Sequence, residues 1–278
     1  MNTFTIDVPG ATVTYDVHGD LSAGSVPLVL IGSPMDAGGF AALAAQFQDR
    51  TVVTYDPRNT GRSTRDDPTS AVTPAQHADD LHVLLQNLGV GPVDMFASSG
   101  GAVNALALVA RYPRDLRTLI AHEPPAGGAL PDHDALHAVC ERIVATYDAS
   151  GIGPAMAQFI ALVMHRGELD SQYLERPAPD PLEFGLPTQD DGHRTDPLMA
   201  NMRGGVVSFL PDVDAVRAAN TRVVIAVGAE SNEEIAARAA YAVAALLGTE
   251  AAVLPGDHSA FTGENPAEFA RALREVLA

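Results

Sequence analysis

The sequence predicts an α/β protein with a largely parallel sheet, because short apolar runs alternate with longer segments of helical pattern along most of the chain. Val26–Ile31 and Thr51–Tyr55 have the length and composition of buried strands, and they end at Gly32 and at Asp56-Pro57. Thr73–Leu88 begins with a threonine cap followed by proline and carries apolar side chains at helical spacing. This alternation favours parallel strands joined by helices.

The remaining elements are predicted by the same patterns. Pro9-Gly10 separates two short apolar runs and predicts an N-terminal hairpin. Val93–Ala97 is a strand that leads directly into Ser98-Ser99-Gly100-Gly101, and the apolar segment after it predicts a buried helix. The predicted strands are residues 4–8, 11–17, 26–31, 51–55, 93–97, 116–122, 222–227 and 251–254, and the predicted helices are 73–88, 102–112, 135–147, 152–164, 197–202, 233–247 and 266–277.

The pattern changes after Glu123-Pro124-Pro125. From about residue 126 to residue 219 the sequence has helical patterns and a Pro/Asp-rich stretch at 177–191, but no obvious strand. We interpret residues 126–210 as a helical cap inserted into a core formed by residues 1–125 and 211–278. The core then holds one mostly parallel sheet of eight strands flanked by helices.

The charged residues exclude several classes of protein. The 278 residues include 17 basic side chains, all of them arginine, and 35 acidic ones, so the formal net charge is −18. Without lysine the chain cannot form a Schiff base with pyridoxal phosphate or build a Walker A phosphate loop. The negative charge also argues against nucleic-acid binding and against docking on anionic membranes.

The cysteine content and the N-terminal residues indicate which cofactors and which cellular location to expect. A single cysteine, Cys140, rules out an intramolecular disulfide and a thiolate cluster, and we expect neither a cofactor nor a metal. The first residues lack the basic and apolar stretches of a signal peptide, and no apolar run approaches the length of a membrane span. We therefore expect a cytoplasmic protein that acts on a small molecule; a homodimer is left open.

The strongest chemical signal is Ala97-Ser98-Ser99-Gly100-Gly101 between a strand and a helix. A nucleophilic serine on such a sharp turn needs small residues two positions before and after it, because the backbone is strained and crowded. Ala97 and Gly101 meet this requirement for Ser99, whereas Phe96 fails it for Ser98. The Gly100 amide, at the start of the following helix, is placed to stabilise an oxyanion.

A second signal is His258, which follows the last predicted strand in a loop containing Gly256 and Asp257. A base in this loop could reach back to Ser99. The chain order of serine, acid and histidine is the one expected for this arrangement. We therefore predict that His258 is the general base that activates Ser99.

With these residues the chain resembles the α/β-hydrolase fold family along essentially its whole length. Ile31-Gly32-Ser33-Pro34 stands where the family often has H-G-x-P, and the segment from Tyr55 to Ser63 is similar to D-x-R-G-x-G-x-S. The serine turn and Gly256-Asp257-His258 complete the resemblance. It implies the α/β-hydrolase fold and a second oxyanion donor in the Ser33 amide, since Pro34 has no N–H.

Two residues depart from the family pattern. Ile31 replaces the usual histidine and so removes a side chain that helps to hold Gly32, Ser33 and Pro34, which we call the oxyanion loop. Asn59 replaces the usual glycine, and after glycine asparagine is the residue that best tolerates a positive φ angle.

The acid that partners the histidine has two candidates. Much of the family places an aspartate three residues after a glycine that ends the strand at 222–227, but Ser231 occupies that position here, and Glu230 lies one residue earlier. The other family location follows the strand at 116–122, where this chain has Glu123. We favour Glu123 over Glu230, and either glutamate would orient the imidazole and stabilise its cation.

Weaker features favour structural roles. His133 and His137 stand four residues apart on a predicted helix, but a solvated acidic face explains them better than a metal site. The segment from His77 to His82 is predicted to lie at the surface. Several methionines fall in or near the cap, and Met35, Met164 and Met199 are candidates for an apolar substrate wall.

These residues predict a serine hydrolase that cleaves a small to medium, fairly apolar carboxylic ester or lactone through an acyl-enzyme on Ser99. An alternative is a cofactor-free enzyme of the same fold that is non-hydrolytic or cleaves carbon–carbon bonds. A ligand-binding or signalling protein on the same scaffold is a further alternative, because the fold alone does not determine function.

Overall fold

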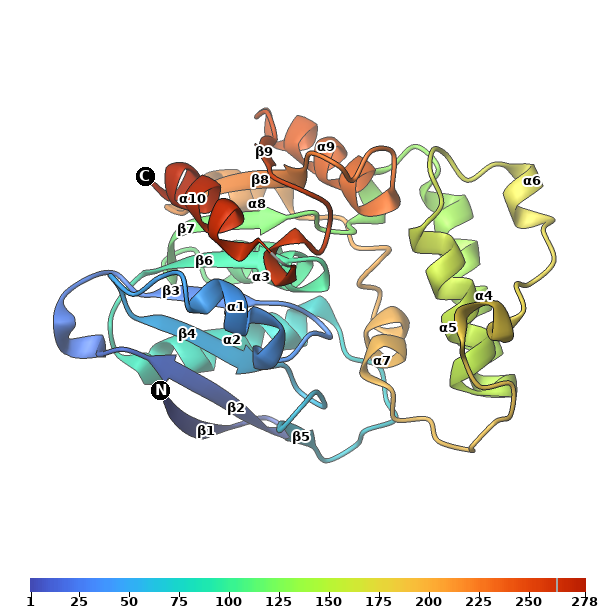
Figure 1. Cartoon of the computed structure of the whole chain (residues 1–278), viewed down its shortest axis with the longest axis horizontal. Coiled ribbons are helices and arrows are strands. Elements are labelled where there is room, and N and C mark those ends of the chain that lie inside the picture. Colours follow the sequence, from blue (N-terminus) through green and yellow to red (C-terminus); the bar gives the residue numbers. More distant parts are fainter. Residues whose placement is uncertain (264) are drawn as a thin grey trace.

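A central twisted sheet with helices on both faces forms most of the molecule (Figure 1). The computed structural model describes residues 1–263 and 265–278. The strands are β1 (Asn2–Val8), β2 (Ala11–His18), β3 (Leu28–Ile31), β4 (Val52–Asp56), β5 (Thr64–Arg65), β6 (Val93–Ser98), β7 (Leu116–His122), β8 (Arg222–Gly228) and β9 (Ala252–Leu254).

The sheet order is β1-β2-β4-β3-β6-β7-β8-β9, and the short strand β5 pairs with β2. β2 pairs antiparallel with β1, β4 and β5, whereas all other pairs are parallel. The prediction of a mostly parallel sheet built on eight strands is therefore confirmed. β5 adds a ninth strand that was not predicted, because two residues are too few to show a periodic pattern.

The helices are α1 (Ala41–Ala44), α2 (Pro74–Leu88), α3 (Gly100–Arg111), α4 (His133–Ser150), α5 (Ile152–Val163), α6 (Ser171–Leu174), α7 (Pro197–Arg203), α8 (Val213–Ala218), α9 (Ile235–Leu247) and α10 (Pro266–Leu277). All seven predicted helices are present, with ends shifted by up to three residues. The helices missing from the prediction, α1, α6 and α8, have four to six residues each. None of the described helices is both long and apolar enough to cross a lipid bilayer.

Local sequence explains where α2 begins and ends. The Thr73 hydroxyl accepts a hydrogen bond from the Gln76 amide at 3.2 Å, and the Gln76 side chain accepts one from the Thr73 amide at 2.9 Å. This reciprocal capping box satisfies two amide groups that a helix start leaves unpaired. Gly89, with a φ angle of 66°, ends the helix in the left-handed conformation that glycine adopts without strain.

The core lies on both faces of the sheet. Along β6, Met95 and Ala97 pack in a large cluster with α2, α3 and α9, whereas Phe96 packs on the opposite face against Phe261 and Phe269. A strand buried on both faces must be apolar at consecutive positions. This is why the predicted strands appear in the sequence as continuous apolar runs.

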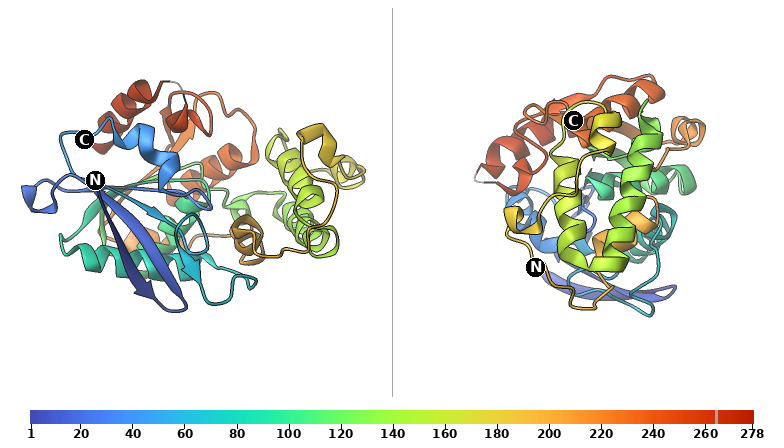
Figure 2. Two further views of the ribbon diagram at one scale, coloured as in Figure 1. Left: turned by 60° about the horizontal axis from the view of Figure 1, so that its bottom comes forward. Right: turned by 90° about the vertical axis from the view of Figure 1, so that its right-hand side faces the viewer.

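Helices α4 to α7 lie beyond one end of the sheet, on the right in Figure 1. α4 and α5 pack side by side, as Figure 2 shows, and α7 packs against α4 and lies between it and the sheet. The segment that contains them connects β7 to α8 and has no strand among its residues, all of which the structure describes. This segment therefore lies beyond the carboxyl ends of the parallel strands.

Candidate active site

Ser99 occupies the sharp turn between β6 and α3. Its φ and ψ angles are 57° and −131°, a region that non-glycine residues adopt only under strain. The Ser99 amide donates a hydrogen bond to the His122 carbonyl at 3.0 Å. A Cβ atom on Gly101 would lie 2.8 Å from the Gly32 Cα atom, so the small residue two positions after Ser99 is required by close backbone approach.

Ser99 and His258 line the same cavity of about 140 Å³. No hydrogen bond joins their side chains in the part of the chain that the structure describes, and such contacts often form only when substrate is bound. The lining residues are Gly32, Ser33, Pro34, Met35, Ser98, Ser99, His258, Ser259 and Phe261. The cavity thus joins the serine turn, the oxyanion loop and the histidine loop.

Glu123 lies against His258. The Nδ1 atom of His258 is 2.5 Å from the Glu123 Oε2 atom, and the Gly228 amide donates a hydrogen bond to Oε1 at 2.7 Å. Burial raises the pKa of Glu123, but the hydrogen bonds that the carboxylate accepts, above all from His258, lower it more, so the net pKa lies below its usual value. The carboxylate is therefore ionised at neutral pH and held through both oxygens.

Glu230, the alternative acid, is exposed on the loop after β8. Its amide donates a hydrogen bond to the Gly256 carbonyl at 2.9 Å, and its carbonyl accepts one from the Asn232 side chain. No hydrogen bond joins its carboxylate to His258 among the described residues. Of the two candidate acids, the structure brings only Glu123 to the histidine.

The two residues predicted to supply the oxyanion donors, Ser33 and Gly100, lie close together. Gly100 is the first residue of α3, so its amide has no carbonyl one helical turn earlier to bind. A Cβ atom on Gly100 would lie 2.5 Å from the Ser33 carbonyl oxygen, which shows how tightly the oxyanion loop approaches the helix start. Ile31, fully buried, offers this loop no hydrogen bond from its side chain.

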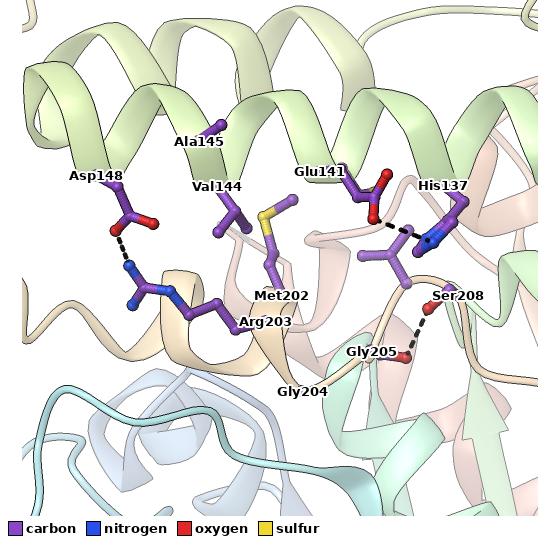
Figure 3. Close-up of a pocket in the computed structure, with 12 residues that line it drawn as sticks. His137, Glu141, Val144, Ala145, Asp148, Met202, Arg203, Gly204, Gly205 and Ser208 are labelled. Carbon is purple, nitrogen blue, oxygen red and sulfur yellow. Dashed lines mark hydrogen bonds and ion pairs between the residues drawn. The ribbon is translucent and has the colours of Figure 1, made fainter.

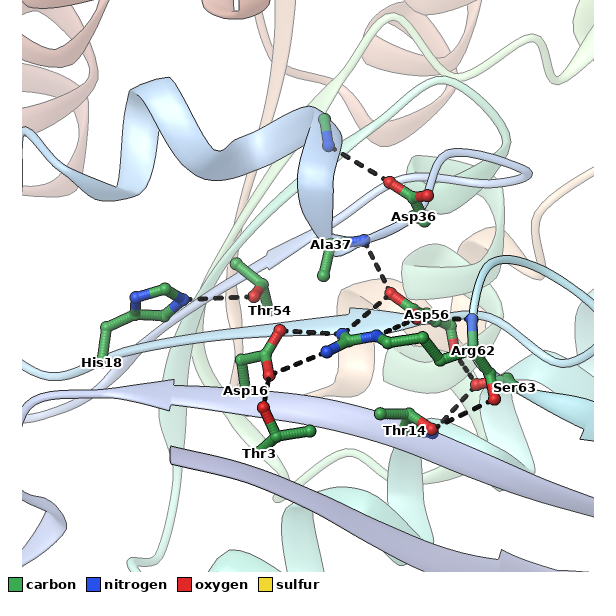
Figure 4. A network of polar contacts seen from close by, with 11 residues as sticks. Thr3, Thr14, Asp16, His18, Asp36, Ala37, Thr54, Asp56, Arg62 and Ser63 are labelled. Atoms are coloured by element: carbon green, nitrogen blue, oxygen red, sulfur yellow. Dashed lines mark hydrogen bonds and ion pairs between the residues drawn. The ribbon is translucent and has the colours of Figure 1, made fainter. Parts of the chain in front are cut away.

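A polar network fixes the chain that follows the oxyanion loop (Figure 4). Asp56 accepts hydrogen bonds from the Ala37 amide at 2.9 Å and from the Arg62 Nε atom at 2.7 Å, and Arg62 also pairs with Asp16 at 2.8 Å. Burial raises the pKa of Asp56, but these partners lower it more, so the net pKa falls. Asn59 has a φ angle of 62°, which confirms the expectation from its replacement of glycine.

A second histidine, His122, lies beside the site and, unlike His258, is fully buried; it was not among the residues predicted for the site. His122 precedes Glu123, and its Nδ1 atom is 3.1 Å from the Ser98 hydroxyl. Burial lowers the pKa of His122 to about 4, so its imidazole is neutral at pH 7. The only signal in the sequence was its position at the end of a strand.

The prediction that the segment from His77 to His82 lies at the surface is wrong for four of its residues. His77, Ala78, Asp80 and Leu81 are buried. Asp80 accepts two hydrogen bonds from Arg58, and the His77 Nε2 atom lies 2.9 Å from the Asn201 Oδ1 atom. Polar side chains can be buried when they are paired, and their partners here lie far away in the sequence.

The three methionines predicted as a substrate wall lie in different environments. Met35 lines the cavity beside Ser99. Met164 is 66% exposed at the end of α5, and Met199 is fully buried in the core. The structure does not bring Met164 and Met199 to this cavity.

A larger cavity of about 510 Å³ lies between α4 and α7 (Figure 3). Its walls carry an ion pair between Asp148 and Arg203 and a contact of 3.5 Å between His137 and Glu141. Burial raises the pKa of the neighbouring Cys140 to about 12, so this thiol stays protonated. Among residues 1–263 and 265–278, no group of three or more His, Cys, Asp or Glu side chains is arranged to hold a metal ion.

Comparison with known proteins places these features in a family. A family model described as alpha/beta hydrolase fold matches residues 28–172. The chain is 29% identical over 282 residues to the uncharacterized hydrolase YraK of Bacillus subtilis, which covers 100% of this chain and 96% of that protein.

Solved structures share the fold over nearly their full length. A thermophilic esterase from Thermogutta terrifontis has a TM-score of 0.69 at 21% identity, covering 100% of this chain and 98% of that one. Est816, described as an N-acyl homoserine lactone degrading enzyme, has a TM-score of 0.65 at 21% identity, covering 98% of this chain and 99% of that one. Together with the family match, which spans more than half of the 278 residues, these findings show that the chain belongs to the alpha/beta hydrolase fold family.

Proposed function

We propose that the protein is a serine hydrolase that cleaves a small to medium, neutral carboxylic ester or lactone through an acyl-enzyme on Ser99. The observation that carries the proposal is the contact of 2.5 Å between Glu123 and His258, at a cavity that Ser99 also lines. An ionised, buried carboxylate bound to one nitrogen of an imidazole leaves the other nitrogen available to take a proton.

The chemistry follows from these groups. In the neutral imidazole the Nδ1–H group of His258 donates a hydrogen bond to Glu123, so Nε2 carries no proton. Nε2 then accepts the proton of the Ser99 hydroxyl as Ser99 attacks the substrate carbonyl. The Gly100 and Ser33 amides stabilise the oxyanion of the tetrahedral intermediate. When the intermediate collapses, the leaving alkoxide takes the proton from His258.

Hydrolysis of the acyl-enzyme repeats these steps with water. His258 accepts a proton from the attacking water, and the same two amides stabilise the second tetrahedral intermediate. Ser99 leaves with the proton that His258 returns, and the carboxylic acid is released. No cofactor is required for either half of the reaction.

The volume and the lining residues of the cavity indicate the substrate class. Its volume of about 140 Å³ suits a short acyl group, and Pro34, Met35 and Phe261 supply apolar surface. No arginine is among the lining residues, and the protein carries a net charge of −18, so a neutral substrate is favoured over an anionic one. The solved structures described above as an esterase and as a lactone-degrading enzyme agree with this class.

We assign residues 126–210 the role of a cap over the cavity and residues 1–125 and 211–278 that of the catalytic core. Within this segment α7 lies next to the core, where the Ala200 carbonyl accepts a hydrogen bond from the Val72 amide at 3.0 Å. A cap of this kind would exclude water from the bound ester.

The test combines covalent labelling with turnover. The purified protein is incubated with a fluorophosphonate probe, the modified peptide is mapped, and hydrolysis of p-nitrophenyl acetate, butyrate and octanoate is measured. We expect an adduct on Ser99 and the highest kcat/KM for the short acyl chains. We also expect turnover to fall by about 10⁴-fold or more in Ser99→Ala.

Ser98→Ala is the matched control, because the Ser98 side chain is the neighbouring hydroxyl in the same cavity. The Ser98→Ala variant should still form the adduct on Ser99. Absence of both ester turnover and the Ser99 adduct would contradict the proposed function. Turnover that survives in Ser99→Ala would instead contradict the choice of nucleophile.

A further inference from the structure

A chain of buried hydrogen bonds runs from α2 through α7 to the oxyanion loop. The His77 Nε2 atom lies 2.9 Å from the Asn201 Oδ1 atom, and the Asn201 Nδ2 atom lies 3.0 Å from the Ser33 Oγ atom. All three side chains are buried, with 2%, 4% and 6% of their surface exposed. In the sequence, Asn201 lies 124 positions after His77 and 168 positions after Ser33.

The direction of these hydrogen bonds is determined by their donors and acceptors. The Oδ1 atom of Asn201 can only accept, so His77 donates through its Nε2–H group. This contact turns the Nδ2 donor of Asn201 toward Ser33, whose hydroxyl accepts. Burial lowers the pKa of His77 to about 4, so at pH 7 its imidazole is neutral and the chain carries no charge.

Asn201 is itself held firmly against the core. Next to it on α7, the Ala200 carbonyl accepts the Val72 amide at 3.0 Å, and the Asn201 carbonyl accepts the Val206 amide at 3.1 Å. At Gly204 the two backbones are so close that a Cβ atom would lie 1.8 Å from the Val72 carbonyl oxygen. The Asn201 amide group is therefore a fixed point rather than a mobile surface group.

The oxyanion loop needs such a fixed point at Ser33. Asp56 anchors the chain just after the loop at the Ala37 amide, and before the loop the side chain of Ile31 offers no hydrogen bond. Ser33 lies between these positions and lines the cavity with Ser99. An oxyanion donor contributes fully only when it is held in place before the charge develops.

We propose that Asn201 is a positioning residue for catalysis, which holds Ser33 through its hydroxyl and thereby couples α7 to the oxyanion site. His77 supports it by fixing the orientation of the Asn201 amide group. The proposal rests on the proposed function, because it assigns the Ser33 amide to the oxyanion. It predicts that the Ser33 side chain matters to catalysis even though the donor is a backbone group.

The experiment is a double-mutant cycle on p-nitrophenyl butyrate hydrolysis. Asn201→Leu removes the donor with little change in size, and Ser33→Ala removes its acceptor but keeps the Ser33 amide. We expect each single variant to lower kcat by about tenfold with KM changed less than twofold, because the lost interaction acts in the transition state. The double variant should also lose about tenfold rather than a hundredfold, since both changes break the same contact.

Met202→Leu, a buried neighbour on the same helix, is the matched control and should retain wild-type kcat. The rate of Ser99 labelling by the fluorophosphonate should fall with kcat in the variants. Thermal unfolding identifies a variant that fails to fold, and Asn201→Ser, which keeps a polar group beside His77, then replaces Asn201→Leu in the cycle.

The outcomes separate this inference from the proposed function. A wild-type protein that is neither labelled at Ser99 nor active would overturn the proposed function. A labelled, active wild type whose Asn201→Leu variant stays within twofold in kcat would overturn the inference alone. Losses that multiply to about a hundredfold in the double variant would also overturn it, because Asn201 would then act independently of Ser33.

Discussion

His258 and Glu123, 135 positions apart in the sequence, are joined at 2.5 Å between the Nδ1 and Oε2 atoms. Glu123 directly follows β7, and His258 lies in the loop after β9, which is separated from β7 by β8 alone. The second carboxylate oxygen accepts the Gly228 amide at 2.7 Å, from the strand between them. A carboxylate held at both oxygens presents one fixed surface to the imidazole, and this arrangement favours a single orientation of the ring.

Glu123→Gln should therefore lower kcat by about 10³- to 10⁴-fold. The amide keeps the size of the carboxylate, but it loses the charge that stabilises the imidazolium and it can bind the wrong tautomer of His258. The measurement is kcat for a neutral ester, with thermal unfolding to verify the fold. Glu230→Gln, at an exposed position, is the control and should retain wild-type kcat. A larger loss in Glu230→Gln would reverse the choice of acid.

The sequence was sufficient for features that depend on neighbouring residues. The strand-to-helix turn at Ser99 was predicted from small residues two positions away, and Gly101 indeed approaches the Gly32 backbone. The threonine cap at Thr73 and the positive φ angle of Asn59 were likewise local. In each case the residues that reveal the requirement lie within a few positions of one another, so the pattern can be read directly, even where the close backbone, Gly32, is distant in the sequence.

Other features depend on contacts that the sequence does not reveal. The choice between Glu123 and Glu230 depends on how β7, β8 and β9 pair, which sets the carboxylate that reaches His258. The burial of His77 depends on Asn201, 124 residues later. Methionine composition could not separate Met35, at the cavity, from Met164, which faces solvent, because both occur in apolar sequence.

Gly101→Ala should lower both stability and activity. The added Cβ would lie 2.8 Å from the Gly32 Cα atom, and both backbones are constrained, so the loop before Ser33 must move. We expect a loss of about 1–3 kcal/mol in the free energy of unfolding together with a fall in kcat. Ala110→Gly on the same helix should lose about 1 kcal/mol through helix propensity but keep its kcat. Equal kcat in the two variants would contradict this reasoning.

Arg62→Met should destabilise the fold by about 2–3 kcal/mol, because Asp16 and Asp56 are buried and lose their cation. Arg111 is the matched control, since its side chain is equally exposed (45%) but pairs with an exposed carboxylate, and Arg111→Met should change stability by less than about 1 kcal/mol. The measurement is urea unfolding at pH 7. Equal losses in the two variants would show that burial of the carboxylates is irrelevant.

The Arg62 effect should also depend on pH. The pKa values of Asp16 and Asp56 are lowered in the folded protein by Arg62, which acts against the effect of burial. Their stabilisation is therefore complete above the unfolded carboxyl pKa of about 4 and is lost as the pH falls through the lower folded pKa values. The difference between wild type and Arg62→Met should shrink below pH 4, and a difference that stays constant would contradict it.

His77 and His122 should make the fold less stable in mild acid. Burial lowers the pKa of each to about 4, whereas the unfolded chain has a histidine pKa of about 6.5. Between these values the unfolded state binds more protons, so stability is full above pH 6.5 and falls toward pH 4. Each histidine contributes a slope of up to about 1.4 kcal/mol per pH unit.

His122→Gln should remove about half of the slope that these two buried histidines contribute, because His77 remains to take up a proton on unfolding. His18, whose pKa is also lowered by burial, adds the same contribution to wild type and variant. Urea unfolding at pH 7, 6, 5 and 4.5 measures the slope in wild type and variant. His193 is exposed, and His193→Gln serves as the control that should keep the wild-type slope. If His122→Gln and His193→Gln gave the same pH dependence, burial of His122 would not be what makes the fold acid-sensitive.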